Sequence, residues 1–184
     1  ENFFNSFQFG DLLYNTLTLS IYQMIATIPM PVILALLLNY TTMPKLKKLA
    51  QSSTFAPHLI SVVVMCGMLQ TFSSSSGLFN LILKAFGQEP ISFLGTPSLF
   101  QTMYVASTVW QRTGYNAVIY IAALSSVSEE LHEAATVDGA SKLQRVWHID
   151  LPSIMPTMVI LIIMAVGNLM SIGFEKSFLL QNEL

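Results

Sequence analysis

The sequence predicts an all-α membrane protein, a bundle of helices that crosses the bilayer four times within its 184 residues. Hydrophobic residues make up 53% of the chain and charged residues only 10%, whereas soluble domains carry roughly 25% charged residues. Four apolar stretches approach or exceed the ~20 residues that a spanning helix needs. Lysine and arginine gather in two of the polar segments between them. We therefore interpret residues 1–184 as a single transmembrane domain.

The first predicted span covers residues 12–38 and is longer than the bilayer requires, so we expect a tilt or a kink. Pro29 and Pro31 supply the cause of a kink, because proline removes a helical hydrogen bond. The loop that follows, residues 40–53, carries the three lysines Lys45, Lys47 and Lys48. Lysines next to a span mark the cytoplasmic side of the membrane.

The second predicted span covers residues 55–72, with Pro57 in its first turn, where a missing N–H does least harm. Residues 73–98 are then polar and rich in glycine and proline, apart from an apolar stretch at 78–86. We predict an external loop with a short interfacial helix. This loop has two possible roles: it contacts a substrate-binding protein, or it simply caps the ends of the spans.

The third predicted span covers residues 99–124 and carries Arg112 near its middle, followed by Tyr115 and Asn116. An arginine in the bilayer centre costs at least ~2.5 kcal/mol. Arg112 therefore lines a watery pathway, pairs with a carboxylate or with free helix-end carbonyls, or extends outward to the surface. The fourth predicted span covers residues 154–172, with Asn168 on a small polar stripe and Glu175 beyond its end.

Between the last two spans lies the longest polar interruption, residues 126–152. Ser126 with Glu129 and Ser141 with Gln144 have the spacing of capping boxes, so each pair predicts a helix start. Asp138-Gly139 predicts the end of the first helix, and Pro152 predicts the end of the second. Neither helix could span a bilayer. The second span leads out of the cytoplasm and the third leads back, so this loop lies on the same side of the membrane as loop 40–53. Together the two loops hold five of the eight lysines and arginines.

This loop carries a recognisable pattern. Glu133-Ala134-Ala135, Gly139 and Ile149-x-Leu151-Pro152 resemble the EAA loop of ABC importer permeases, and the wording of residues 130–141 resembles their carbohydrate-uptake branch. The resemblance implies a coupling helix that docks on a separate ATPase subunit. The coupling residues it implies are Glu133, Ala134, Ala135, Asp138, Gly139, Ala140, Ile149, Leu151 and Pro152. The family core usually has six or more spans, so we expect a further helix at each end.

The resemblance also implies the partners and the location. We expect an ABC ATPase subunit that binds ATP and Mg²⁺, a second permease subunit, an extracytoplasmic solute-binding protein and the lipid bilayer of a bacterial plasma membrane. Loops 40–53 and 126–152 would be cytoplasmic. The substrate implied is an oligosaccharide or a polysaccharide fragment. The residues expected along the translocation path are Arg112, Tyr115, Asn116, Asn168 and Glu175.

Other classes of function find little support. His132-Glu133 begins like a zinc-protease helix, but Thr136 stands where the second histidine must be. The sequence has no phosphate-binding loop, no catalytic constellation, no metal site and no basic patch for nucleic acid. We therefore expect a transport subunit without its own cofactor. A permease for another class of solute, or a channel or carrier that does not use ATP, is the alternative.

Overall fold

The computed structural model describes residues 7–168 and 174–180, and all secondary structure in these ranges is helical. The chain forms two compact units, which are described separately. The first unit comprises Glu1–Ala26, Leu59–Val109 and Asn168–Leu184, and the second unit comprises Thr27–His58 and Trp110–Gly167. The long helix α6 (Pro97–Leu124) contributes its first half to the first unit and its second half to the second unit.

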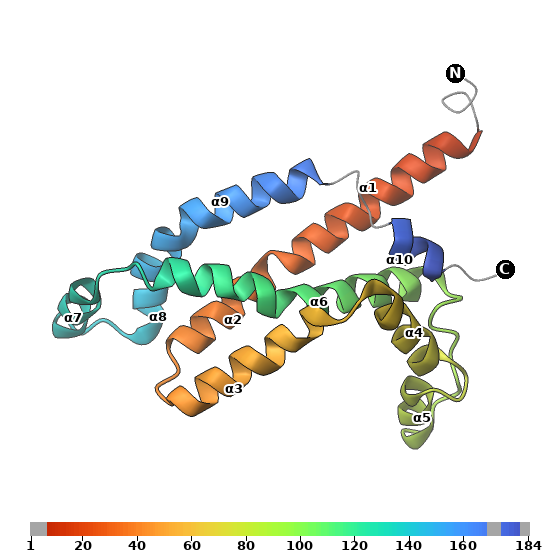
Figure 1. Ribbon diagram of the computed structural model, residues 1–184, viewed down its shortest axis with the longest axis horizontal. Coiled ribbons are helices and arrows are strands. Elements are labelled where there is room, and N and C mark those ends of the chain that lie inside the picture. Colours follow the sequence, from red (N-terminus) through yellow and green to blue (C-terminus); the bar gives the residue numbers. More distant parts are fainter. Residues whose placement is uncertain (1–6, 169–173, 181–184) are drawn as a thin grey trace. The chain divides into compact units, whose positions relative to one another are not determined.

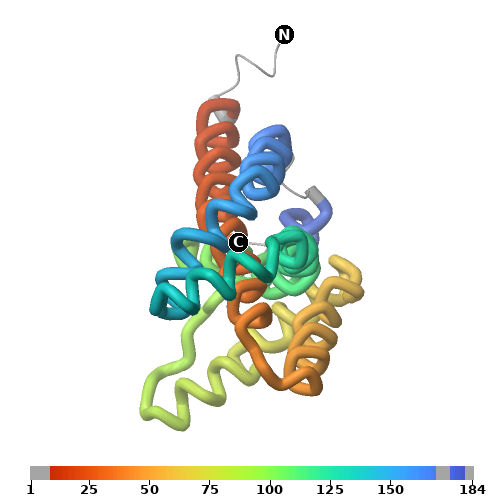
Figure 2. The backbone as a smooth tube through the Cα atoms, turned by 90° about the vertical axis from the view of Figure 1, so that its left-hand side faces the viewer, coloured from red at the N-terminus to blue at the C-terminus, as the bar shows by residue number. Residues whose placement is uncertain are grey.

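The second unit holds both predicted cytoplasmic loops. Besides the end of α6, its elements are α2 (Pro29–Asn39), α3 (Pro44–Phe55), the 3-10 turn η1 (Ala56–Leu59), α7 (Glu129–Val137), α8 (Lys142–Arg145), the π turn η2 (Val146–Asp150) and α9 (Leu151–Gly167). A short connection turns α2 back into α3, as the orange segment shows (Figure 1, Figure 2). The core of this unit joins α2, α6 and α9 through Val32, Ala35, Ala117, Tyr120, Leu124 and Ile154.

The first unit consists of α1 (Phe7–Thr27), α4 (Val62–Ser73), α5 (Leu78–Ala85), the beginning of α6 and α10 (Phe174–Leu179). Its core joins α4, α6 and α10 through Met65, Cys66, Leu69, Tyr104, Val105 and Leu180. The predicted apolar helix at 78–86 is present as α5. Asn80 of this helix is buried and donates from Nδ2 to the carbonyl oxygens of Ser74 and Ile91, at 2.9 and 3.0 Å.

Three stretches of the described residues are long and apolar enough to cross a membrane: Phe9–Asn39, Val62–Ala85 and Lys142–Gly167. The first of them is interrupted at Ile28, and α2 begins at Pro29, so the helix breaks at the predicted proline. Helix α6 has 28 residues and is long enough to cross, but it is less apolar than the three. Its polar side chains include those of Gln111, Arg112 and Asn116.

The predicted start of the second span is wrong. Instead of opening that helix, Pro57 lies in η1, after α3 has continued to Phe55, and α4 begins only at Val62. Proline has no N–H to continue the helical ladder, and its ring clashes with a carbonyl of the preceding turn. The new helix is started by Ser61, whose hydroxyl accepts a hydrogen bond from the Val64 N–H at 3.3 Å. Helix α9 ends at Gly167, and the predicted end of the fourth span at Ile172 lies outside the described residues.

Candidate functional site: the loop between the last two spans

The N-cap of helix α7 lies two residues after the predicted one. Ser126 still belongs to the turn that ends α6, where its hydroxyl donates to the Ala123 carbonyl at 2.7 Å. The N-cap of α7 is Ser128, whose side chain makes no capping hydrogen bond. The Ser126–Glu129 prediction is therefore wrong, because a serine hydroxyl can bond back to its own helix as readily as it can cap the next one.

The predicted end of α7 is confirmed. Asp138 is its C-cap, and Gly139 follows with φ of +78°, a conformation that residues with a Cβ avoid. The Gly139 N–H donates to the Thr136 carbonyl at 3.1 Å, and the Ala140 N–H donates to the Ala135 carbonyl at 2.8 Å. These bonds satisfy the last carbonyls of the helix, as in a Schellman motif.

The second helix of the loop starts as predicted but does not end as predicted. The Ser141 hydroxyl accepts from the Gln144 N–H at 3.3 Å, and the Gln144 side chain accepts from the Ser141 N–H at 2.7 Å. Pro152 does not stop this helix, because the ladder widens into the π turn η2 and then continues as α9. A wider turn relieves the clash between the proline ring and the carbonyl four residues before it.

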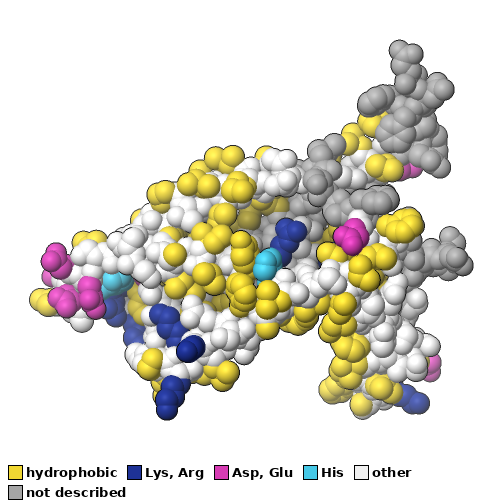
Figure 3. Space-filling model, viewed as in Figure 1, with side chains coloured by type: hydrophobic (Ala, Val, Ile, Leu, Met, Phe, Trp, Pro, Cys, Tyr) yellow, Lys and Arg dark blue, Asp and Glu magenta, His cyan; other side chains and the backbone are white. Residues whose placement is uncertain are grey.

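Helix α7 is almost entirely exposed. None of its nine residues is buried, Glu133 and Ala134 face solvent, and the side chain of Val137 is 88% exposed. Acidic side chains gather over α7, whereas lysine and arginine side chains lie over α3 and α8 (Figure 3). Only His132 and Ala135 of this helix are half-buried, so they form its inner face. The small side chain of Ala134 leaves the outer face open to close approach by another surface.

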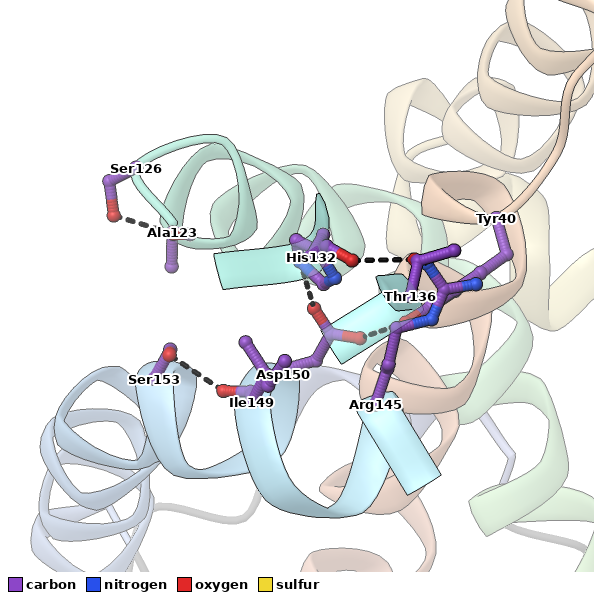
Figure 4. Close-up of polar contacts among 9 residues, drawn as sticks. All are labelled: Tyr40, Ala123, Ser126, His132, Thr136, Arg145, Ile149, Asp150 and Ser153. Carbon is purple, nitrogen blue, oxygen red and sulfur yellow. Dashed lines mark hydrogen bonds and ion pairs between the residues drawn. The ribbon is translucent and has the colours of Figure 1, made fainter. Parts of the chain in front are cut away.

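Three polar side chains meet behind α7, close to the end of α2 (Figure 4). Asp150 is fully buried, and its Oδ2 accepts a 2.6 Å hydrogen bond from the Tyr40 hydroxyl. Its Oδ1 lies 3.3 Å from His132 Nε2, within ion-pair range, but the imidazole is not aligned for a hydrogen bond. We did not predict Tyr40 or Asp150 as site residues. The sequence feature that could have pointed to Asp150 is that a carboxylate occupies the variable position, x, of Ile149-x-Leu151-Pro152.

Arg145 completes this cluster. Its Nη1 donates to the Thr136 hydroxyl at 3.0 Å, and its guanidinium carbon lies 5.9 Å from the centroid of the Tyr40 ring. Burial raises the pKa of Tyr40 to about 12, and the hydrogen bond to Asp150 and the charge of that carboxylate act in the same direction. The positive charge of Arg145 acts in the opposite direction. Tyr40 therefore stays a neutral donor throughout the physiological range.

The residues predicted for the coupling role fall into two groups. Glu133, Ala134, Ala135, Asp138, Gly139 and Ala140 lie on α7 and its C-terminal turn. Ile149, Leu151 and Pro152 lie at the junction of η2 with α9, where the Ile149 carbonyl accepts a 2.6 Å hydrogen bond from the Ser153 hydroxyl. Both groups belong to the second unit.

The predicted path residues are divided between the two units. Arg112, Tyr115 and Asn116 lie on the second-unit part of α6, whereas Asn168 and Glu175 belong to the first unit and are exposed. Tyr115 stacks on His58 with ring centroids 4.1 Å apart. Arg112 is exposed and forms no ion pair with any residue that the structure describes.

Lys176, which follows Glu175, is buried rather than placed at a surface. Its Nζ donates to the Tyr104 carbonyl at 2.9 Å and to the hydroxyls of Ser107 and Thr108 at 2.8 and 2.7 Å. It also lies 4.2 Å from the centroid of the Tyr104 ring. These contacts hold α10 against α6 within the first unit. The geometry of Lys176 is therefore that of a tether.

Residues 8–182 match the family model of the binding-protein-dependent transport system inner membrane component. The chain belongs to this family. Membership in this permease family, as the EAA loop predicted, is thereby confirmed. Protein LplB of Bacillus subtilis is 36% identical over 185 residues, which cover 100% of this chain and 58% of LplB. The polygalacturonan/rhamnogalacturonan transport system permease protein YteP of the same organism is 37% identical, over 93% of this chain and 54% of YteP.

Solved structures agree with this assignment to the permeases. A crystal structure of a bacterial ABC transporter involved in the import of the acidic polysaccharide alginate matches with a TM-score of 0.95 and 36% identity. The match covers 99% of this chain and 64% of that chain. The permease chain described here thus spans between about half and two thirds of the length of these relatives.

Proposed function

We propose that this permease is a transmembrane subunit of an ATP-driven importer for oligosaccharides or polysaccharide fragments. The observation that carries the proposal is α7, a nine-residue helix without a buried residue, fixed at its end by Gly139 and with Glu133 and Ala134 of the Glu-Ala-Ala sequence exposed. A short helix this exposed has little packing to stabilise it, which favours a docked partner surface. The partner we infer is an ABC ATPase subunit that binds ATP and Mg²⁺.

The direction of transport follows from the same assignment. Loops 40–53 and 126–152 face the cytoplasm, where the ATPase is available, and residues 73–98 face outward. The chain works with a second permease subunit and receives substrate from an extracytoplasmic solute-binding protein. ATP binding closes the ATPase pair, α7 moves with it, and the helix bundle alternates between inward-open and outward-open states. The residues that contact the sugar along this path are Arg112, Tyr115, Asn116, Asn168 and Glu175.

The names of the relatives support a saccharide as the solute. YteP is named for polygalacturonan and rhamnogalacturonan, and the alginate transporter has also been crystallised with an alginate pentasaccharide-bound periplasmic protein. AraP of Bacillus subtilis, 31% identical, is named for arabinooligosaccharides. Uptake of oligogalacturonate, alginate pentasaccharide and arabinooligosaccharide by cells that express the whole system would identify the class.

The coupling role is tested by a pair of matched glycines. Gly139 in the loop and Gly87 after α5 have φ of +78° and +75°, and neither has an atom within 4 Å of an added Cβ. Replacing either by aspartate imposes the same backbone strain. We expect Gly139→Asp to abolish co-purification of the ATPase subunit or uptake, whereas Gly87→Asp retains both. Normal uptake and normal co-purification in Gly139→Asp would refute the docking assignment.

A further inference from the structure

The weak attachment of α7 raises the question of what carries its movement to the membrane helices. Two of its side chains, His132 and Thr136, stand one turn apart and make its polar contacts with the rest of the second unit. Their partners are Asp150 and Arg145, which lie at the two ends of the segment that leads into α9. The inner face of α7 is therefore attached to the base of a predicted span.

The π turn η2 is what aims Asp150. The Leu151 N–H donates to the carbonyl of Val146, five residues earlier, rather than four as in an α-helix. Arg145 and Asp150 reach toward the same side, since both contact α7 and Tyr40. In a regular α-helix they would diverge by about 140°. The widened turn before Pro152 thus has a use beyond relieving the proline clash.

Asp150 also contacts a third element. The Tyr40 hydroxyl, at the C-cap of α2, donates to Oδ2 at 2.6 Å, while His132 of α7 approaches Oδ1. One buried carboxylate is thereby shared between α7, the base of α9 and the end of α2. The groups that face it are Tyr40, His132 and, from α8, the guanidinium of Arg145 beside the tyrosine ring. Loss of either contact leaves a buried carboxylate poorly compensated.

We propose that Asp150 is a positioning residue that locks α7, the base of α9 and the end of α2 into one rigid body, so that movement of the docked loop reaches two membrane helices together. The inference rests on the proposed docking of α7. Tyr40 and His132 are the two arms of this lock, and the hydrogen bond to Tyr40 is the stronger arm, because a short bond to a carboxylate exceeds an unaligned contact in strength.

The experiment uses the full importer in nanodiscs and follows two single-cysteine labels. Cys66→Ser removes the one cysteine of residues 1–184, and a cysteine-free importer that carries it gives the background. A cysteine at Val137, 88% exposed on α7, reports docking through its protection from a maleimide when the ATPase subunit is added. A fluorophore on a cysteine at Met43, which is 65% exposed beyond the end of α2, reports movement of α2 when ATP and vanadate are added.

We expect Tyr40→Phe and Asp150→Asn to keep the protection at Val137 but to reduce the ATP-vanadate response at Met43 by roughly fivefold to tenfold, as loss of a buried charge-assisted hydrogen bond implies. The double variant should lose no more than the worse single variant, because both changes break one bond. Tyr14→Phe removes a hydroxyl from a side chain that is 71% exposed and should change neither label.

The outcomes separate the two proposals. If Val137 is not protected by the ATPase in the unmodified protein, the docking of α7 is wrong and the lock falls with it. If Val137 is protected and Tyr40→Phe responds fully at Met43, docking stands and the lock is wrong. Additive losses in the double variant would equally reject it. Should Asp150→Asn fail to assemble, Tyr40→Phe alone decides, since it removes one oxygen from a half-buried ring.

Discussion

Gly114 of α6 lies directly against the backbone of Thr54 at the end of α3. A Cβ at Gly114 would overlap the carbonyl group of Thr54 and meet the amide nitrogen of Phe55 at 2.7 Å. The neighbouring atoms belong to the main chain and cannot rotate away, so the missing side chain is what lets these two elements approach. Next to this contact, Tyr115 stacks on His58 within the 3-10 turn that interrupts the second predicted span.

The first prediction concerns this contact. Gly114→Ala forces the backbone of α3 and α6 apart, and we expect a loss of at least about 1–3 kcal/mol, as for overpacked cores. Thermal unfolding of the purified protein in detergent, followed by fluorescence, measures the loss. Gly67→Ala is the matched control, because a Cβ at Gly67 in α4 meets no atom within 4 Å. Equal melting temperatures for the two variants would show that α3 and α6 do not touch at Gly114.

The second prediction concerns the titration of Tyr40. Burial raises its pKa from 10.0 to about 12, and the hydrogen bond to Asp150 and the charge of that carboxylate contribute to the shift. The neutral phenol makes the hydrogen bond, so the bond is complete below pH 10 and is lost as the pH rises through about 12. In a phenolate absorbance titration, Tyr40→Phe should remove a step near pH 12. Asp150→Asn should shift that step toward pH 10, and a step that stays in place would contradict the contact.

The third prediction concerns residues 74–91, around α5. Asn80 is buried, its Oδ1 accepts from the Ile91 N–H at 2.8 Å, and its Nδ2 donates to two carbonyls. Asn80→Leu leaves these backbone groups without hydrogen-bond partners, which lowers the free energy of unfolding by about 1–3 kcal/mol. We expect faster amide exchange across residues 74–91, measured by mass spectrometry. Gln88→Ala, on the exposed surface nearby, should leave the exchange unchanged. Equal amide exchange in the two variants would show that the hydrogen bonds of Asn80 do not stabilise this segment.

The fourth prediction concerns Lys176 in the first unit. Lys176→Met removes three hydrogen bonds that tie α10 to α6 at Tyr104, Ser107 and Thr108. We expect a melting temperature lower by several degrees and a cleavage site near α10 that becomes accessible to protease. Lys84→Met is the control, since Lys84 on α5 is exposed. If Lys176→Met melts normally yet impairs uptake, Lys176 acts on the substrate path instead of tethering α10.

Local features of the fold were predictable because their partners lie within a few residues. The Asp138-Gly139 stop and the Ser141–Gln144 capping box are closed by hydrogen bonds over three to five positions. The apolar stretches could be predicted from residue composition alone. Where one serine has two nearby choices, as at Ser126, the pattern predicted the wrong one, since both bonds have similar strength.

The sequence by itself determined that this is a helical membrane permease with an EAA loop, since apolar length and short motifs act locally. Only the tertiary structure decided that Pro152 widens the helix into a π turn instead of ending it, and that Asp150 meets Tyr40 across 110 positions. The physical reason is that a buried carboxylate is stabilised by whichever donor the packing brings to it. No spacing along the chain encodes a donor so distant.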